Sequence, residues 1–278
     1  LTSDPAEWFD TRVRDSLSDI VSTPLTDLAW DIATLPCSLG GCGLTSAVHT
    51  RNAAHYASWA ASWHNITRMF PAAITITHAS LDTCALPFAR GLRTAHRSTE
   101  ASCTALTDNL HQHPLPPLAP KNASIPAPTE LSTRFPTAQK RFAAIAQGAR
   151  WLGAFHRATQ PHRACMLSQC QQGANFAFNA VPSQAHGAML PMSFVTACQL
   201  RLRLPLSLLQ GITTCVCGAA VDCYGDHCLS CRHLQTHRTP WHNLVEHAAA
   251  GMARHARYHV SHDSRRPRAT LAVYSPHY

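Results

Sequence analysis

Cys215-Val216-Cys217-Gly218, followed by His227 and Cys231, is the stretch that decides the fold of the C-terminal part of this chain. Three thiols and an imidazole within 17 residues can complete a tetrahedral zinc site. One residue separates the first two cysteines, so only a bent turn brings both sulfurs to one ion, and Gly218 supplies the backbone freedom for it. The other two candidates are four residues apart, on one face of a helical turn. The pattern predicts a structural zinc site without an open position for a catalytic water, whose ligands are Cys215, Cys217, His227 and Cys231.

Spare ligands surround this pattern and leave alternatives open. Cys223, Cys228, His233 and His237 could each replace one of the four, and Cys228 competes directly with the adjacent His227. The chain has 12 Cys and 19 His, so these residues could also be ordinary free thiols and imidazoles. On that interpretation the protein is a helical structural or interaction domain with neither metal nor nucleic-acid ligand.

The charge distribution indicates a polyanionic partner. The net charge is +8, and no Asp or Glu occurs between Leu131 and Val221, where eight Arg or Lys residues fall. Because arginine neutralises phosphate, this balance favours non-specific contacts with RNA or DNA. The ratio of 21 Arg to 2 Lys is also what a GC-rich coding sequence produces, so part of the basicity has that second explanation. The predicted contact residues are Arg201, Arg203, Arg232, Arg254 and Arg257.

The hydrophobic pattern predicts a mainly helical protein with a proline-rich interruption. Helices are expected over residues 4–21, 46–70, 137–155, 192–204 and 239–258. Seven prolines between His113 and Pro136 exclude regular structure there and predict a disordered linker. The expected organisation is a helical region over 1–112, the linker over 113–136, a helical region over 137–209, a zinc-stabilised knuckle module with its following helix over 210–260, and a basic tail over 261–278.

Hydropathy and cysteine usage indicate the environment. No run of 18 apolar residues and no charged-then-apolar leader occurs, so neither a membrane span nor a signal peptide is expected. Twelve cysteines without a secretory signal favour metal binding and free thiols in a reducing compartment, the nucleus or the cytoplasm.

Three further segments carry a resemblance to a known family. Leu35-Pro36-Cys37-Ser38-Leu39-Gly40-Gly41-Cys42-Gly43-Leu44, followed by Ala54-His55-Tyr56-Ala57-Ser58-Trp59, resembles the segment just C-terminal to the polymerase domain of non-LTR retrotransposon reverse transcriptases. Gln199-Leu200-Arg201-Leu202-Arg203-Leu204-Pro205 is similar to the Leu-Arg-Leu-Gly-Leu-Pro helix end that precedes the family's cysteine-histidine motif. The candidate ligands, with Asp222, Gly225-Asp226 and His242-Asn243, then follow in the family's order.

The resemblance covers about residues 30–65 and 172–250, and it implies a place in a larger polyprotein. In the family, the cysteine-histidine motif is thought to bind zinc and nucleic acid between the polymerase and a restriction-like endonuclease. Residues 1–112 would then correspond to a thumb or connector-like region that follows the polymerase.

Departures from the family's pattern limit the expected activity. Trp241 stands where the family has Arg, and Arg203 stands where it has Gly. No Asp-Asp pair occurs, and the 19 residues beyond His259 contain one carboxylate, Asp263, whereas metal-assisted hydrolysis needs several. We therefore expect neither a polymerase nor a nuclease active site in this chain. The sequence predicts a nucleic-acid-associated fragment of a polyprotein whose full-length family is an RNA-directed DNA polymerase with endonuclease.

Overall fold

The computed structural model describes residues 4–71, 83–84, 87–109, 138–171, 173–174, 178, 190–234, 259–262 and 271–274. The chain divides into two compact units, Leu1–Ser207 and Leu208–Tyr278. The Pro-rich linker expected over 113–136 and the helix expected over 239–258 lie outside the described residues.

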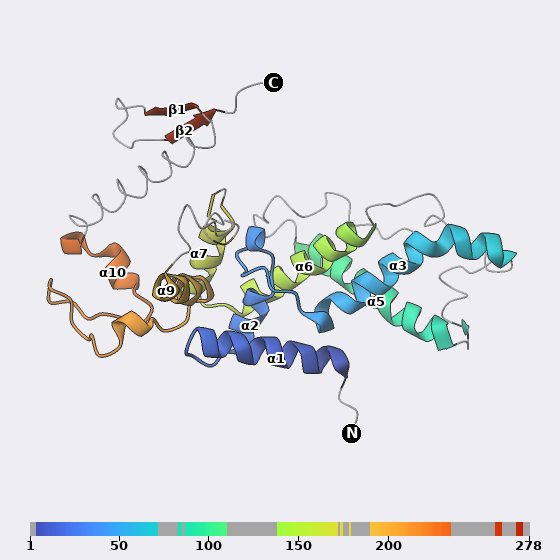
Figure 1. The fold of residues 1–278 in the computed structure, drawn as a ribbon, viewed down its shortest axis with the longest axis horizontal. Helices are drawn as coiled ribbons and strands as arrows, with labels where there is room; N and C mark the ends of the chain where they lie inside the picture. Colours follow the sequence, from blue (N-terminus) through green and yellow to red (C-terminus); the bar gives the residue numbers. More distant parts are fainter. Residues whose placement is uncertain are drawn as a thin grey trace. The chain divides into compact units, whose positions relative to one another are not determined.

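The described protein is mainly α-helical, as predicted. In chain order the helices are α1 (Pro5–Ile20), α2 (Asp27–Ala33), η1 (Cys37–Leu39), α3 (Ala47–Met69), α5 (Pro87–Asn109), α6 (Ala138–Arg157), α7 (Gln160–Gln169), α9 (Pro191–Leu202), η4 (Ser207–Leu209) and α10 (Asp226–Ser230) (Figure 1). Helices α1, α3, α6 and α9 begin within one residue of the predicted starts, which confirms those four predictions. The hydrophobic pattern does not predict α2, α5 or α7.

Polar side chains fix the starts of the first helices. The Asp4 carboxylate accepts a hydrogen bond from the Ala6 N–H at 3.0 Å and caps α1. Ser46 caps α3 by accepting from the His49 N–H at 3.1 Å. Asp10, which is buried in α1, accepts from the Ser46 hydroxyl at 2.5 Å and from the Ala47 N–H at 2.7 Å. A carboxylate of α1 therefore holds the positive end of α3, and the two helices are joined there.

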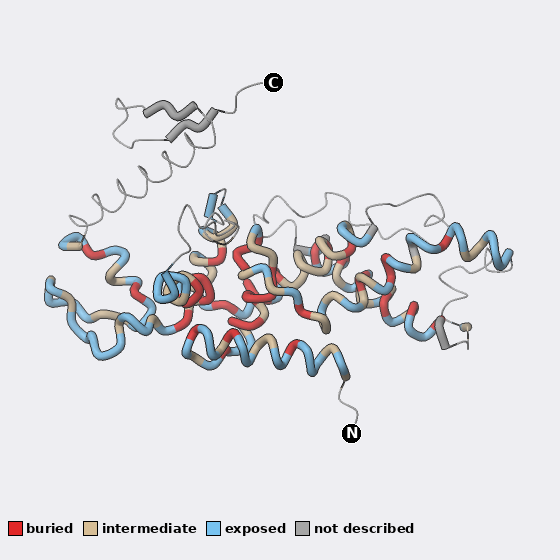
Figure 2. The backbone as a smooth tube through the Cα atoms, in the orientation of Figure 1, coloured by how far each residue is buried: buried red, intermediate tan, exposed pale blue. Residues whose placement is uncertain are grey.

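One core of buried residues in the first unit includes parts of α1, α2, α7 and α9 as well as α3, α5 and α6, which pack against one another (Figure 2). Tyr56 of α3 is fully buried, and its ring centroid lies 5.4 Å from that of His96 on α5 and 5.2 Å from that of Phe142 on α6. Helices on both sides of residues 113–136 thus share one core within one unit.

Asp31 joins α2 to α3 and α6. Its carboxylate accepts a hydrogen bond from the Arg157 guanidinium, and it lies 3.9 Å from Arg150 Nη2 and 3.6 Å from His49 Nε2. Partial burial acts to raise the pKa of this carboxyl, but the hydrogen bonds from His49 and Arg157 outweigh it, and the pKa is lowered. The group therefore stays ionised at neutral pH and holds the end of α6 against α2.

Arg201 connects two of the segments that carry the family resemblance. Its side chain is buried, with 4% exposure. Its Nε donates to the Gly41 carbonyl and its Nη2 to the Cys37 carbonyl, both at 2.7 Å. The guanidinium carbon also lies 4.4 Å from the ring centroid of Phe178. This guanidinium faces the protein interior and is not available to a phosphate, which corrects the nucleic-acid contact predicted for Arg201.

Arg203 ends α9 in a left-handed conformation, with φ 49° and ψ 52°. The next N–H, of Leu204, donates to the Gln199 carbonyl at 2.8 Å, which is the Schellman arrangement of a helix end. Glycine is the residue that adopts this conformation at least cost. A glycine at this position, as in the family segment that residues 199–205 resemble, would adopt the left-handed conformation without strain. Arg203 adopts it at the expense of backbone strain.

The second unit ends in two strands. β1 (His259–His262) pairs with β2 (Leu271–Tyr274) in an antiparallel register that places His259 opposite Tyr274 and His262 opposite Leu271. No strand is predicted for the tail over 261–278. Short runs with Val and Tyr favour extended backbone, but four-residue runs give too weak a pattern to be recognised in sequence.

Among the described helices, none combines the length and the apolar character needed to cross a bilayer.

Gly41→Ala is expected to lower the free energy of unfolding by at least about 2 kcal/mol, because the added Cβ would lie 2.0 Å from the Leu35 carbonyl oxygen. The matched control is Gly153→Ala on α6, where nothing lies within 4 Å of the added Cβ. This control should raise stability by about 0.5–1 kcal/mol through helix propensity. Urea unfolding followed by far-UV circular dichroism measures both, and equal stabilities would contradict the close approach of the loop backbone.

Arg203→Gly is expected to raise the free energy of unfolding by about 1 kcal/mol, because it relieves the left-handed strain at the end of α9. Arg203→Ala removes the same side chain but retains the Cβ, so it should bring no such gain. The same urea titration compares the two, and identical midpoints would show that backbone strain is not the determinant.

Candidate metal centre

The first two candidate ligands lie on a tight turn. An isolated bridge pairs Thr214 with Ala220, and the Cys215 N–H donates to the Ala219 carbonyl at 2.9 Å. Gly218 has φ 84°, and its N–H donates to the Cys215 carbonyl at 2.8 Å. This is the bent knuckle that the sequence predicts, and Gly218 stands at the position that requires positive φ.

Asp222 builds the second half of the site. Its Oδ1 accepts from the N–H groups of Tyr224 and Asp226 at 2.9 and 3.0 Å, and its Oδ2 accepts from the His227 N–H at 2.8 Å. Partial burial acts to raise the pKa of this carboxyl, but the three N–H donors outweigh it, and the pKa is lowered. Gly225, at φ 80°, precedes α10. The turn held by Asp222 sets where α10 begins and therefore where His227 lies.

Knuckle and helix bring four donor atoms together. One ligand atom from each of Cys215, Cys217, His227 and Cys231 lies within 4.8 Å of the other three. The Sγ atoms of Cys215 and Cys231 are 3.7 Å apart, and Cys217 Sγ lies 3.3 Å from His227 Nε2. Tetrahedral zinc with Zn–S bonds of about 2.3 Å requires sulfur–sulfur separations of about 3.8 Å. The donor set therefore fits one zinc ion, and it would fill all four positions.

Backbone hydrogen bonds and neighbouring sulfurs shift the pKa values of two thiols in this cluster. Hydrogen bonds from the N–H groups of Leu234 and His233, with the neighbouring thiols, lower the pKa of Cys231 to about 6 against the effect of burial. The Ala219 N–H acts to lower the pKa of Cys217, but burial and the adjacent sulfurs outweigh it and raise the pKa. Because metals bind the thiolate, the lowered pKa favours the metal-binding form of Cys231.

The spare ligands lie outside the cluster. Among the described residues, the one group of donors close enough to share a metal excludes Cys223, Cys228 and His233. Cys223 and His233 are exposed, while Cys228 is half-buried on α10. His237 lies outside the described residues. The geometry thus selects His227 over Cys228 because α10 points the imidazole toward Cys217.

The predicted nucleic-acid residues have different surroundings. Arg232 is exposed directly after Cys231, and Arg203 is half-buried at the end of α9. Arg254 and Arg257 lie outside the described residues. The burial of Arg201 counts against the contact predicted for it, and nothing in the sequence of α9 indicates that burial.

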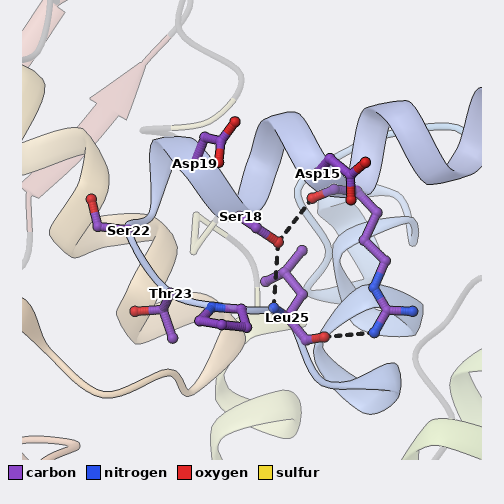
Figure 3. Close-up of a pocket in the computed structure, with 8 residues that line it drawn as sticks. Asp15, Ser18, Asp19, Ser22, Thr23 and Leu25 are labelled. Carbon is purple, nitrogen blue, oxygen red and sulfur yellow. Dashed lines mark hydrogen bonds between the residues drawn. The ribbon is translucent and has the colours of Figure 1, made fainter.

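A pocket of about 550 Å³ lies in the first unit, lined by the last turns of α1 and the residues that follow (Figure 3). Ser18 accepts from the Leu25 N–H at 3.4 Å and donates to the Arg14 carbonyl at 3.0 Å. The Arg14 guanidinium donates to the Leu25 carbonyl at 2.5 Å. These bonds close the turn between α1 and α2, so the pocket is part of a structural turn.

Comparison with known proteins relates a short part of the chain to a retrotransposon. The chain is similar to the retrotransposable element SLACS 132 kDa protein of Trypanosoma brucei gambiense, with 40% identity over 50 residues. The matched stretch is 18% of this chain and 4% of that protein. No protein-family model and no solved structure matches the chain. The similarity supports a relation to retrotransposons at this coarse level.

His227→Asn is expected to lower zinc affinity by at least about 100-fold, because it removes one of four protein ligands. Cys228→Ser is the matched control on the same turn of α10 and should leave the affinity within about threefold of wild type. Competition with a chromogenic chelator measures both. Visible absorption after cobalt(II) substitution should be unchanged by Cys228→Ser, and a changed spectrum would reassign the fourth ligand to Cys228.

Proposed function

We propose that this chain is a nucleic-acid-associated segment of a non-LTR retrotransposon reverse transcriptase polyprotein, in which a structural zinc ion holds the second unit together. The observation that carries the proposal is the donor set of Cys215, Cys217, His227 and Cys231 in a segment with little other core. Four protein ligands leave no site for a reacting water, so the metal serves structure.

The burial pattern of the second unit supports a structural metal. Among residues 208–234, Cys231 is the one buried hydrophobic residue, at 5% exposure. Val216 and Leu229 are 85% and 59% exposed. A segment that buries so little apolar surface needs another source of stability, and metal coordination supplies it in small domains.

The order of landmarks supports the polyprotein. The loop over residues 35–44 and the helix end over 199–205, which carry the resemblance, are in direct contact through Arg201, and the cysteine-histidine cluster follows them in sequence. The similarity to a trypanosome retrotransposon protein agrees with this reading. The proposed segment lies between a polymerase and an endonuclease, has no complete active site of its own, and works in the nucleus or cytoplasm.

Nucleic-acid association rests on charge. Arg203, Arg232, Arg254 and Arg257 remain proposed contacts to RNA or DNA phosphates, whose binding would depend on salt and little on base sequence. The competing function is a helical structural or interaction domain with neither metal nor nucleic acid, in which the cysteines only fill space.

Cys217→Ser should reduce bound zinc from one equivalent per chain to a small fraction, and Cys223→Ser, an exposed thiol outside the cluster, should retain it. Elemental analysis of the purified chain gives the stoichiometry. Hydrogen–deuterium exchange should show that Cys217→Ser or a strong chelator exposes amides between residues 210 and 234 while α1 to α6 stay protected. If the purified protein contains no metal and the chelator does not change its hydrogen–deuterium exchange, the result would favour the helical structural or interaction domain without a ligand.

A further inference from the structure

Charge in the first unit is segregated between two sets of helices. The stretch from Asp4 to Ala33, with α1 and α2, contains seven carboxylates and two arginines. Helices α3, α5 and α6 together contain nine Arg or Lys residues and two carboxylates, Glu100 and Asp108. If the arginines came only from a GC-rich coding sequence, basic residues and carboxylates would not be expected to fall on different helices.

Acidic partners neutralise the basic residues nearest to α1 and α2. Arg51 of α3 pairs with Asp4, and Arg157 of α6 pairs with Asp31, which Arg150 also approaches. These three arginines are therefore committed to holding the first unit together. The other basic residues of the three helices lie from the middle of α3 toward its other end.

The contacts between the helices show which residues share that end. Tyr56 in the middle of α3 meets His96 of α5 and Phe142 of α6. A Cβ at Gly148 of α6 would lie 3.1 Å from the Leu106 side chain, so α5 and α6 run in the same direction. Helix α6 reaches Asp31 at its C-terminal end, so the starts of α5 and α6 lie at the end of α3 that is remote from α2 (Figure 1).

Six basic residues extend from the middle of α3 toward this remote end and form what we call the distal basic surface: Arg68, Arg90, Arg93, Arg97, Lys140 and Arg141. Four of them are exposed and two are half-buried. The same helices carry two carboxylates, Glu100 and Asp108. Glu100 Oε2 lies 3.9 Å from His96 Nδ1. The cations outnumber them three to one.

Helix α5 organises the densest part of this surface. Arg90, Arg93 and Arg97 recur at intervals of three and four, so they share one side of the helix. Ala89, Leu92 and Ala95 are buried on the other side, against α3 and α6. The stripe is about 10 Å long at 1.5 Å per residue, a length over which duplex DNA presents about six phosphate charges.

We infer that the distal basic surface binds the phosphate backbone of a nucleic acid, with Arg90, Arg93 and Arg97 as its central contacts. The inference rests on the proposed nucleic-acid association and gives it a site in the first unit, far in sequence from the cysteine-histidine cluster. The charge complementarity is sequence-independent, so the surface positions the strand and does not read bases.

The test uses the full zinc-loaded chain and a fluorescein-labelled 20-nucleotide single strand or duplex, with anisotropy measured from 50 to 300 mM NaCl. Arg90→Gln/Arg93→Gln/Arg97→Gln should weaken binding about tenfold or more and reduce the slope of log K against log salt by about 2 to 3. The matched control Arg12→Gln/Arg14→Gln/Arg51→Gln removes three charges from the acidic end and should change binding less than about threefold. Circular dichroism and urea midpoints verify that both variants fold.

The outcomes separate the surface from the proposed function. If the wild-type chain binds and the α5 triple variant binds equally well, the inference about the distal basic surface is wrong, while the proposed nucleic-acid association stands. If both triple variants lose affinity equally, binding responds to net charge alone, and the inference about the surface is again wrong. No wild-type binding at any salt would reject both. Self-association through the acidic α1 of a second copy, seen by sedimentation and not displaced by oligonucleotide, would assign the surface to a protein partner.

Discussion

The buried guanidinium of Arg201 is the interaction on which the arrangement of the first unit depends. Gly41 and Arg201 are 160 positions apart in the chain, and the guanidinium donates to the Gly41 carbonyl and to the Cys37 carbonyl, which also accepts from the Gly40 N–H. A buried charge is tolerated only when it is fully hydrogen-bonded, and removing one partner leaves the others unpaired. The nearby Gln199 works in the same way, donating to the Val21 carbonyl at 2.9 Å. Polar side chains of α9 thus hold the loop and the end of α1 where apolar packing alone would not fix their register.

The two units obtain their stability from different sources. The first buries aromatic and aliphatic side chains such as Tyr56, Phe142 and Trp151, so its fold follows from ordinary packing of α3, α5 and α6. The second exposes Val216 and Leu229 and depends on hydrogen-bonded turns around the four donor atoms. Asp222 has the role there that Arg201 has in the first unit, because one charged group satisfies several backbone groups at once. In the proposed function, a metal ion and a preformed turn together would take the place of a hydrophobic core.

Sequence could predict what is local and not what is set by distant contacts. The starts of α1 and α3 follow from Asp4 and Ser46, and the four side chains that lie together as candidate metal ligands follow from a spacing within 17 residues. Helix α5 is absent from the predicted helices although its buried residues from Leu92 to Leu106 recur at intervals of three and four, a pattern that the sequence offers. The role of Arg201 cannot be predicted from sequence. The sequence of a helix does not distinguish an arginine that binds a phosphate from one that donates to a buried carbonyl. The choice of His227 over Cys228 depends on the turn that Asp222 holds, which spacing alone does not specify.

The segregation of charge has an energetic consequence for the first unit. Pairs such as Asp4 with Arg51 and Asp31 with Arg157 stabilise the junction of the acidic and basic helices. The distal basic surface has six cations and two carboxylates on its helices, and an excess of one sign of charge opposes folding most strongly at low salt. A polyanion bound there would relieve the repulsion as well as gain contacts, so its binding would be linked to the stability of α3, α5 and α6. In this proposal, the same excess of positive charge that opposes folding would give a phosphate backbone its affinity for the surface.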